Sequence, residues 1–215
     1  MRVMLFDTET DGLIINPESQ TQPRICEVFC LMLEQKGSGA EAEFSVLDSY
    51  HTLVNPERVM SDEVVAIHHI TNAMVAHEPT FKQVAPFIAR FVNKAHRVVA
   101  HFAMFDKLMI DLEFRRVGYK DELKWPEIFC TVEQTEHWFQ HRLPLGTNKR
   151  GKPGLYQVLF DNESFSDAHR AKADVLALER CYQRCEQIGW NYESLHEPTP
   201  QPVKREEAQM TLPFQ

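Results

Sequence analysis

The sequence predicts an α/β fold in which a mixed β-sheet is flanked by helices. Three apolar, β-rich segments come first, at residues 2–6, 26–33 and 43–54. After them, strand-like segments at 97–101 and 125–130 alternate with helix-like segments. Strands first and an alternation of strands and helices afterwards together indicate a mixed sheet with helices on its faces.

Local signals mark the individual elements. A Lys-Gly-Ser-Gly turn at 36–39 separates the second strand from the third. Ser61 opens a short helix, and apolar residues recur at helical spacing over 80–93. Two further helices are expected at 103–117 and 132–140, and a last one from Ser166 or Asp167 to about Ile188. Ligands of such folds gather near the strand ends of the sheet.

The length and composition favour one folded domain followed by a tail. The chain has 215 residues, enough for a single core and too few for two comfortable ones. Residues 1–195 are expected to form this domain. Residues 196–215 carry three prolines within five residues, then charge, which predicts a flexible tail.

Charge and cysteine content exclude several classes of protein. The net charge is −8, so the chain does not coat duplex DNA by bulk positive charge. No apolar run approaches the ~20 residues of a membrane helix, and no membrane partner is expected. Five cysteines in a chain this long do not make a disulfide scaffold, which favours the reducing cytoplasm.

Two carboxylates close the first predicted strand. Residues i and i+2 of a strand point to the same face, so Asp7 and Glu9 should project together. Two like charges that close repel one another unless a cation lies between them, and oxygen ligands select Mg²⁺, Mn²⁺ or Ca²⁺. Taken alone, this weak pattern favours a solvated strand end before the Asp11-Gly12 turn.

Two later segments add acidic residues and a histidine. Asp106 lies in the first turns of the helix that follows the 97–101 strand, where the helix dipole alone could explain a carboxylate. His169 and Asp174 lie five residues apart. In one continuous helix they would point about 140° apart, so both can face one site only if His169 precedes the helix. A histidine beside carboxylates can act as a general base near neutral pH.

In this order, the segments resemble the motifs of the DEDD exonuclease superfamily, and more narrowly its His-containing branch. That branch includes the proofreading subunit of bacterial replicative polymerases, exodeoxyribonuclease X, RNase T and oligoribonuclease. The resemblance covers roughly residues 1–190. Residues 7–13 (DTETDGL) resemble the whole first motif, and residues 66–71 (AIHHIT) resemble the segment before the second.

The resemblance implies a ribonuclease-H-like fold and a two-metal hydrolase. It implies that Asp7, Glu9, Asp106 and Asp174 hold two divalent cations, Mg²⁺ or Mn²⁺, and that His169 activates water. Two such ions can bind both the attacking water and the leaving 3′ oxygen.

The resemblance also implies substrate contacts, with one departure from the family pattern. The expected contacts are Thr8, Thr10, Leu13, His68, Phe102 and Phe105. The second motif usually reads His-Asn-Ala-x-Phe-Asp, and here Phe102 replaces the asparagine. Phe102 could stack on a base or pack in the core.

The tail carries a short apolar peptide at residues 209–214 (QMTLPF). It resembles the peptide by which proteins bind the bacterial sliding clamp. The expected partner contacts are a hydrogen bond from Gln209 and apolar contacts from Leu212 and Phe214. The alternative is that the peptide docks on its own domain.

Together these features predict a metal-dependent 3′–5′ exodeoxyribonuclease that releases nucleoside monophosphates from single-stranded 3′ ends. The clamp-like peptide favours DNA proofreading or repair, with a polymerase as a further partner. One alternative is a 3′–5′ exoribonuclease that trims RNA ends on the same catalytic frame. Another is a non-catalytic tether between a polymerase and the clamp.

Overall fold

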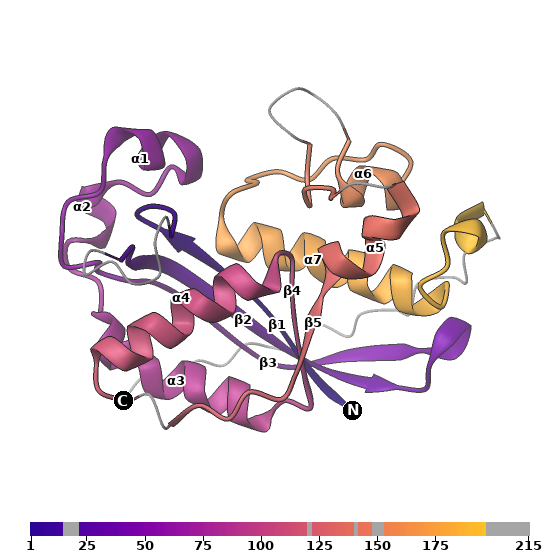
Figure 1. The fold of residues 1–215 in the computed structure, drawn as a ribbon, viewed down its shortest axis with the longest axis horizontal. Helices are drawn as coiled ribbons and strands as arrows, with labels where there is room; N and C mark the ends of the chain where they lie inside the picture. The colour runs from indigo at the N-terminus through magenta and orange to yellow at the C-terminus, as the bar shows by residue number, and fades with distance from the viewer. Residues whose placement is uncertain (15–21, 120–121, 140–141, 148–152, 197–215) are drawn as a thin grey trace.

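The computed structural model describes residues 1–14, 22–119, 122–139, 142–147 and 153–196 (Figure 1). Five strands form one sheet in the order β3-β2-β1-β4-β5. They are β1 (Arg2–Thr10), β2 (Ile25–Lys36), β3 (Glu43–Leu53), β4 (Arg97–Ala100) and β5 (Glu127–Cys130). The β1–β2 and β2–β3 pairs are antiparallel, and the β1–β4 and β4–β5 pairs are parallel. The predicted mixed sheet is therefore confirmed.

Helices cover both faces of this sheet (Figure 1). The α-helices are α1 (Asp62–His68), α2 (Asn72–Val75), α3 (Phe81–Lys94), α4 (Ala103–Arg116), α5 (Thr131–Phe139), α6 (Leu155–Leu159) and α7 (Ala171–Gln187). Short 3-10 helices occupy Gly39–Glu41 and Tyr192–His196. In the part of the chain that is described, no helix has the length and apolar character to cross a membrane.

The two faces of the sheet bury separate cores. Side chains of α3 and α4 pack on one face against Met4 and Phe6 of β1. Side chains of α6 and α7 pack on the other face against Val3 and Leu5. Alternate residues of β1 therefore enter opposite cores, as the period of a strand requires. This alternation decides which helix each residue at the end of β1 meets.

The sequence placed most elements correctly but misplaced the start of the last helix. It begins at Ala171 with Arg170 as the N-cap, and not at Ser166 or Asp167. Asp167 and His169 have left-handed backbone conformations, with φ of +58° and +67°. An α-helix cannot contain such residues, so the helix starts after them. The short helices α2 and α6 were not predicted, since four or five residues carry too little periodicity.

Candidate active site

The predicted first motif lies at the C-terminal end of β1, whose side chains alternate between the two faces of the sheet. The strand continues past Phe6 to Thr10, so Asp7 and Glu9 are part of it. By the alternation of β1, both carboxylates face the α7 side, whereas Thr8 faces the α4 side. The acidic residues of α7 and of α4 can therefore approach the same strand end from opposite faces.

Asp174 of α7 completes a cluster with the two strand carboxylates. Carboxylate oxygens of Asp7, Glu9 and Asp174 lie within 4.8 Å of one another. All three side chains are partly buried. Asp174 lies in the first turn of α7, and this helix packs directly on β1 and β2. The structure thus brings together three of the four predicted metal ligands.

Asp106 reaches the same strand end from the opposite face. It lies in the first turn of α4 and is only 3% exposed. Thr8 donates two hydrogen bonds to Asp106 Oδ1, from its backbone N–H at 3.0 Å and from its hydroxyl at 2.7 Å. Thr8 was predicted as a substrate contact, but in this structure its hydroxyl is directed at Asp106.

Burial and mutual repulsion make these carboxyl groups hard to ionise without a cation. Burial, and then the charges of Asp106 and Glu9, raise the pKa of Asp7 well above its ordinary value. Burial and the charge of Asp174 raise the pKa of Glu9 to about 8. Burial also raises the pKa of Asp106 and of Asp174 to about 7, although hydrogen bonds from Thr8 and His169 oppose these shifts.

His169 lies in the loop that precedes α7, as the shared site requires. Its φ of +67° belongs to the left-handed region. Its backbone N–H donates a hydrogen bond of 3.0 Å to Asp174 Oδ2. The predicted general base and the last predicted ligand are therefore joined directly by one hydrogen bond.

The donor set suits hard divalent cations. Asp7, Glu9 and Asp174 offer only carboxylate oxygens, which are the ligands that Mg²⁺ and Mn²⁺ prefer. Burial, together with mutual repulsion, raises their pKa values, so their ionised forms are unfavourable when no cation is bound. A bound cation would supply balancing positive charge, so these residues fit a divalent metal.

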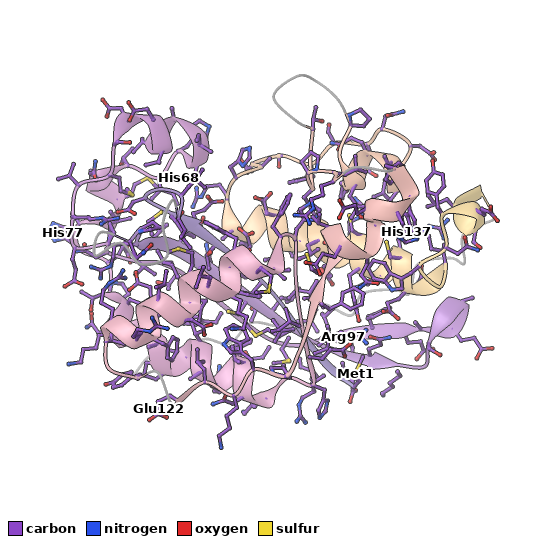
Figure 2. The ribbon with its side chains drawn as sticks, viewed as in Figure 1. Met1, His68, His77, Arg97, Glu122 and His137 are labelled. Carbon is purple, nitrogen blue, oxygen red and sulfur yellow. The ribbon has the colours of Figure 1, made fainter. Side chains whose placement is uncertain are left out.

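His68, predicted to contact a substrate base, is covered in this structure. Its side chain is 2% exposed, at the end of α1 (Figure 2). Its Nδ1 accepts a hydrogen bond of 3.0 Å from the Ile70 backbone, and its Nε2 lies 3.8 Å from Cys26 Sγ. A motif match reports the position of a residue along the chain, but not whether its side chain is covered.

The remaining predicted substrate contacts differ in exposure. Leu13 is 76% exposed and Phe102 is 43% exposed. Phe105 is partly buried and packs against the core beneath α4. The Thr10 hydroxyl donates to the backbone oxygen of Gly12 at 2.7 Å, within the turn after β1. The predicted partner residues Gln209, Leu212 and Phe214 lie outside the described residues.

Sequence reasoning missed a buried ion pair beside the site. Glu27 of β2 pairs with Arg170, which immediately follows His169. A glutamate within the predicted apolar strand 26–33 was the available signal, because a buried carboxylate needs a partner. Glu27 and Arg170 also line a cavity of about 420 Å³ on the α7 side of the site.

Comparison with known proteins identifies the family. A family model described as "Exonuclease" (RNase_T) matches residues 4–182. The chain belongs to this exonuclease family. It is thus a member of the DEDD superfamily with a ribonuclease-H-like fold, and its class of chemistry is phosphodiester hydrolysis.

Relatives of this exonuclease include polymerase subunits that are longer than the matched region. The chain is 32% identical to DNA polymerase III subunit epsilon of Treponema pallidum over 108 residues, 50% of this chain and 44% of the relative. It is 27% identical to the Haemophilus influenzae subunit over 180 residues, 78% of this chain and 66% of the relative. The matches thus span about half to two thirds of those relatives.

Solved exonuclease structures share the fold. Exonuclease X in complex with 5′ overhanging duplex DNA is 25% identical, with a TM-score of 0.55. That match covers 90% of this chain and 96% of the other. Exonuclease I matches with a TM-score of 0.66 at 16% identity, over 89% of this chain and 42% of the other, and shows the fold alone.

Divalent cations should stabilise this exonuclease more at pH 8.5 than at pH 6. Raised pKa values mean that the metal-free fold binds more protons than the unfolded chain between about pH 4 and pH 8. Raising the pH through this window therefore destabilises the metal-free protein. A bound cation relieves the repulsion among the carboxylates. At high pH it also meets less competition from protons for these groups. Saturation at 100 times the Kd adds about 2.7 kcal/mol, several degrees in Tm.

Thermal unfolding with Mn²⁺ or with EDTA at both pH values measures this difference. Asp7→Asn serves as the matched variant, since it removes one of the repelling charges. It should raise the Tm in EDTA at pH 8.5 and shrink the Mn²⁺-dependent increase. An equal Mn²⁺-dependent increase at the two pH values would contradict the electrostatic argument.

Proposed function

We propose that the chain is a metal-dependent 3′–5′ exodeoxyribonuclease that releases nucleoside monophosphates from single-stranded or frayed DNA 3′ ends. The observation that carries the proposal is the convergence of Asp7, Glu9 and Asp174 within 4.8 Å, beside the His169 loop. The DNA-bound Exonuclease X structure and the polymerase III relatives favour DNA as the substrate. Such an activity would serve DNA proofreading or DNA repair.

In the proposed site, Asp7, Glu9, Asp106 and Asp174 hold two divalent cations, Mg²⁺ or Mn²⁺. When bound, such a pair of ions stabilises the attacking and the leaving oxygens of an in-line displacement. The role of Thr8 is to orient Asp106 through its two hydrogen bonds. Protons compete with cations for these carboxyl groups, so we expect activity to fall as the pH is lowered.

The role of His169 in this proposal is to take the proton from the attacking water. The water oxygen bonds to the terminal phosphorus as the bond to the leaving 3′ oxygen breaks. The products are a nucleoside 5′-monophosphate and a strand with a new 3′-hydroxyl. His169 can accept the proton only in its neutral form, which adds a second reason for low activity at acid pH.

Digestion of matched 5′-labelled single-stranded DNA and RNA with Mg²⁺ tests this function. We expect a descending ladder on DNA, absent in EDTA and reduced by at least about a thousandfold in Asp106→Ala, which removes a metal ligand. Asp111→Ala, five residues later on α4, is the matched control and should retain activity.

The possible outcomes separate the alternatives. A ladder only on RNA would assign the chain to exoribonucleases that trim RNA ends. Wild-type biological function in Asp106→Ala would indicate a non-catalytic tether between a polymerase and the clamp. Products that shorten from the 5′ end would overturn the proposed polarity.

Phe102 is proposed to stack on a substrate base. It is the N-cap of α4, four residues before Asp106, and its φ is +61°. A left-handed conformation costs an L-residue about 1–2 kcal/mol, and asparagine tolerates it better than phenylalanine. An exposed aromatic ring held in a strained backbone next to the carboxylates supports a role in binding rather than in core packing.

Phe102→Asn should therefore weaken substrate binding without lowering the stability of the fold. We expect unchanged or higher stability, by up to about 1 kcal/mol, from relief of backbone strain. We also expect KM for single-stranded DNA to rise at least about fivefold, since stacking contributes about 1–3 kcal/mol per base. Urea unfolding and steady-state kinetics measure both, with Phe102→Tyr as the control that keeps the ring. An unchanged KM in Phe102→Asn would exclude stacking.

The tail peptide is proposed to bind the bacterial sliding clamp. The proposal rests on the sequence at 209–214, with Gln209 at the edge of the clamp's groove and Leu212 and Phe214 within it. The preceding segment of ~13 residues spans ~20 Å as a random coil, a reasonable reach between a clamp and a 3′ end. The resemblance to polymerase III epsilon further suggests a polymerase as an additional partner.

Truncation of the two apolar side chains should abolish clamp binding. Each buried apolar side chain contributes about 1.5–3 kcal/mol, so Leu212→Ala/Phe214→Ala should weaken binding at least about a hundredfold. Surface plasmon resonance on an immobilised clamp measures this loss, with Gln215→Ala as the control. Equal binding by the double variant would reject the peptide as the contact.

A further inference from the structure

Glu27 is a buried carboxylate for which the proposed chemistry provides no role. It lies on β2 directly opposite Glu9 in the β1–β2 ladder, and its side chain is 1% exposed. Neighbouring β2 residues of the same parity, Phe29 and Leu31, enter the core beneath α7. Glu27 therefore faces α7 from the strand beside the catalytic cluster.

Both oxygens of Glu27 are occupied by donors of the protein itself. Arg170 binds it with two hydrogen bonds, Nε to Oε2 at 3.0 Å and Nη2 to Oε1 at 2.8 Å. The Ala171 backbone N–H donates to Oε2 at 3.0 Å, and His51 Nε2 lies 2.8 Å from Oε1. Burial alone would raise the pKa of Glu27, but the bonds from His51, Arg170 and Ala171 lower it to about 2. The carboxylate is thus ionised and saturated with donors.

These bonds anchor the junction between the His169 loop and α7. Arg170 is the N-cap of α7, and its backbone oxygen accepts from the Asp174 N–H at 3.0 Å. Asp174 in turn accepts the His169 N–H at 3.0 Å. One continuous series of contacts therefore runs from Glu27 through Arg170 to Asp174 and His169. His169 has a left-handed conformation, which costs an L-residue about 1–2 kcal/mol, and these contacts favour it.

We propose that Glu27 and Arg170 are positioning residues that hold the His169 loop in its catalytic geometry. The proposal rests on the proposed function, in which His169 accepts the proton from water. A bidentate arginine–carboxylate pair suits this task because its planar geometry fixes orientation as well as distance. Glu27 acts through Arg170 and Ala171, and it does not touch the reacting atoms. A displacement of about 1 Å of a catalytic group can lower a rate about a hundredfold.

The fold contains a matched control for this pair. Glu113 of α4 is also buried, with a side chain 1% exposed. It pairs with Arg24 at 3.0 Å and Arg116 at 2.6 Å, and it accepts the Ile25 backbone N–H at 3.2 Å. It therefore offers the same chemistry, a buried carboxylate bound by arginine and one backbone N–H, without contact to the His169 loop.

The experiment compares Glu27→Gln, Arg170→Lys and Glu113→Gln in the full chain. The amide of Glu27→Gln places an NH₂ group against donors, and Arg170→Lys keeps the charge but loses the bidentate geometry. We expect kcat to fall at least tenfold in both variants, with KM and the half-saturating Mn²⁺ concentration changed less than twofold. The kcat of the double variant should be no lower than that of the less active single variant, because both residues act through one contact. Glu113→Gln should lower Tm with kcat changed less than twofold.

Hydrogen exchange supplies a readout that does not require activity. Amide exchange in the segment 167–172 should accelerate at least tenfold in Glu27→Gln and Arg170→Lys, and stay unchanged in Glu113→Gln. If the wild type degrades neither DNA nor RNA, the proposed function fails. Exchange then still decides whether the pair holds the loop.

Three results would overturn the inference. Equal effects on kcat in Glu27→Gln and Glu113→Gln would reduce Glu27 to a general contribution to stability. A large increase in the half-saturating Mn²⁺ concentration in Glu27→Gln, with kcat restored at saturation, would make Glu27 part of the metal site instead. Unchanged exchange in the loop would show that other contacts hold His169. Arg170→Lys keeps the test valid if Glu27→Gln does not fold.

Discussion

The alternation of side chains along β1 is the constraint on which the site depends. Odd-numbered residues of this strand face α7, and even-numbered residues face α4. The strand therefore delivers Asp7 and Glu9 to Asp174 on one side and Thr8 to Asp106 on the other. A shift of one residue in the register of β1 would turn Asp7 and Glu9 to the α4 face and away from Asp174, and would turn Thr8 away from Asp106. The two apolar cores thus fix the register that the polar site requires.

The same geometry concentrates negative charge where the fold tolerates it least. Burial and repulsion raise the pKa of Asp7, Glu9, Asp106 and Asp174, so the metal-free site is under electrostatic strain. Glu27 lies beside this cluster, yet its pKa is lowered because donors surround it. Neighbouring carboxylates on adjacent strands are therefore divided into two kinds. The clustered carboxyl groups have raised pKa values, whereas Glu27 is neutralised by its ion pair with Arg170.

The sequence predicted the mixed sheet from the order of its strands and helices, and the resemblance to the DEDD superfamily implied which carboxylates cluster. Strand alternation places Asp7 and Glu9 on one face, and helix geometry lets His169 and Asp174 share a site only if His169 precedes the helix. Burial of His68 could not be predicted in this way, because it depends on how α1 packs over Cys26. The start of α7 was also misplaced, because the left-handed conformations of Asp167 and His169 depend on tertiary contacts.

The Glu27–Arg170 pair is a further feature that local patterns do not reveal, since its partners lie 143 residues apart in the chain. The pair joins β2 to the helix that carries Asp174, and β2 pairs with the strand that carries Glu9. Loop, helix and strand are thereby fixed to one another at the point where the carboxylates converge. At the opposite end of the sheet, Arg97 of β4 (labelled in Figure 2) pairs with Glu127 of β5, whose side chain is 53% exposed. Both pairs are bidentate, but water screens a pair with an exposed carboxylate, whereas Glu27 is 1% exposed. The Glu27–Arg170 pair lies at the end of the sheet where the positions of the carboxylates and of His169 must be held most closely.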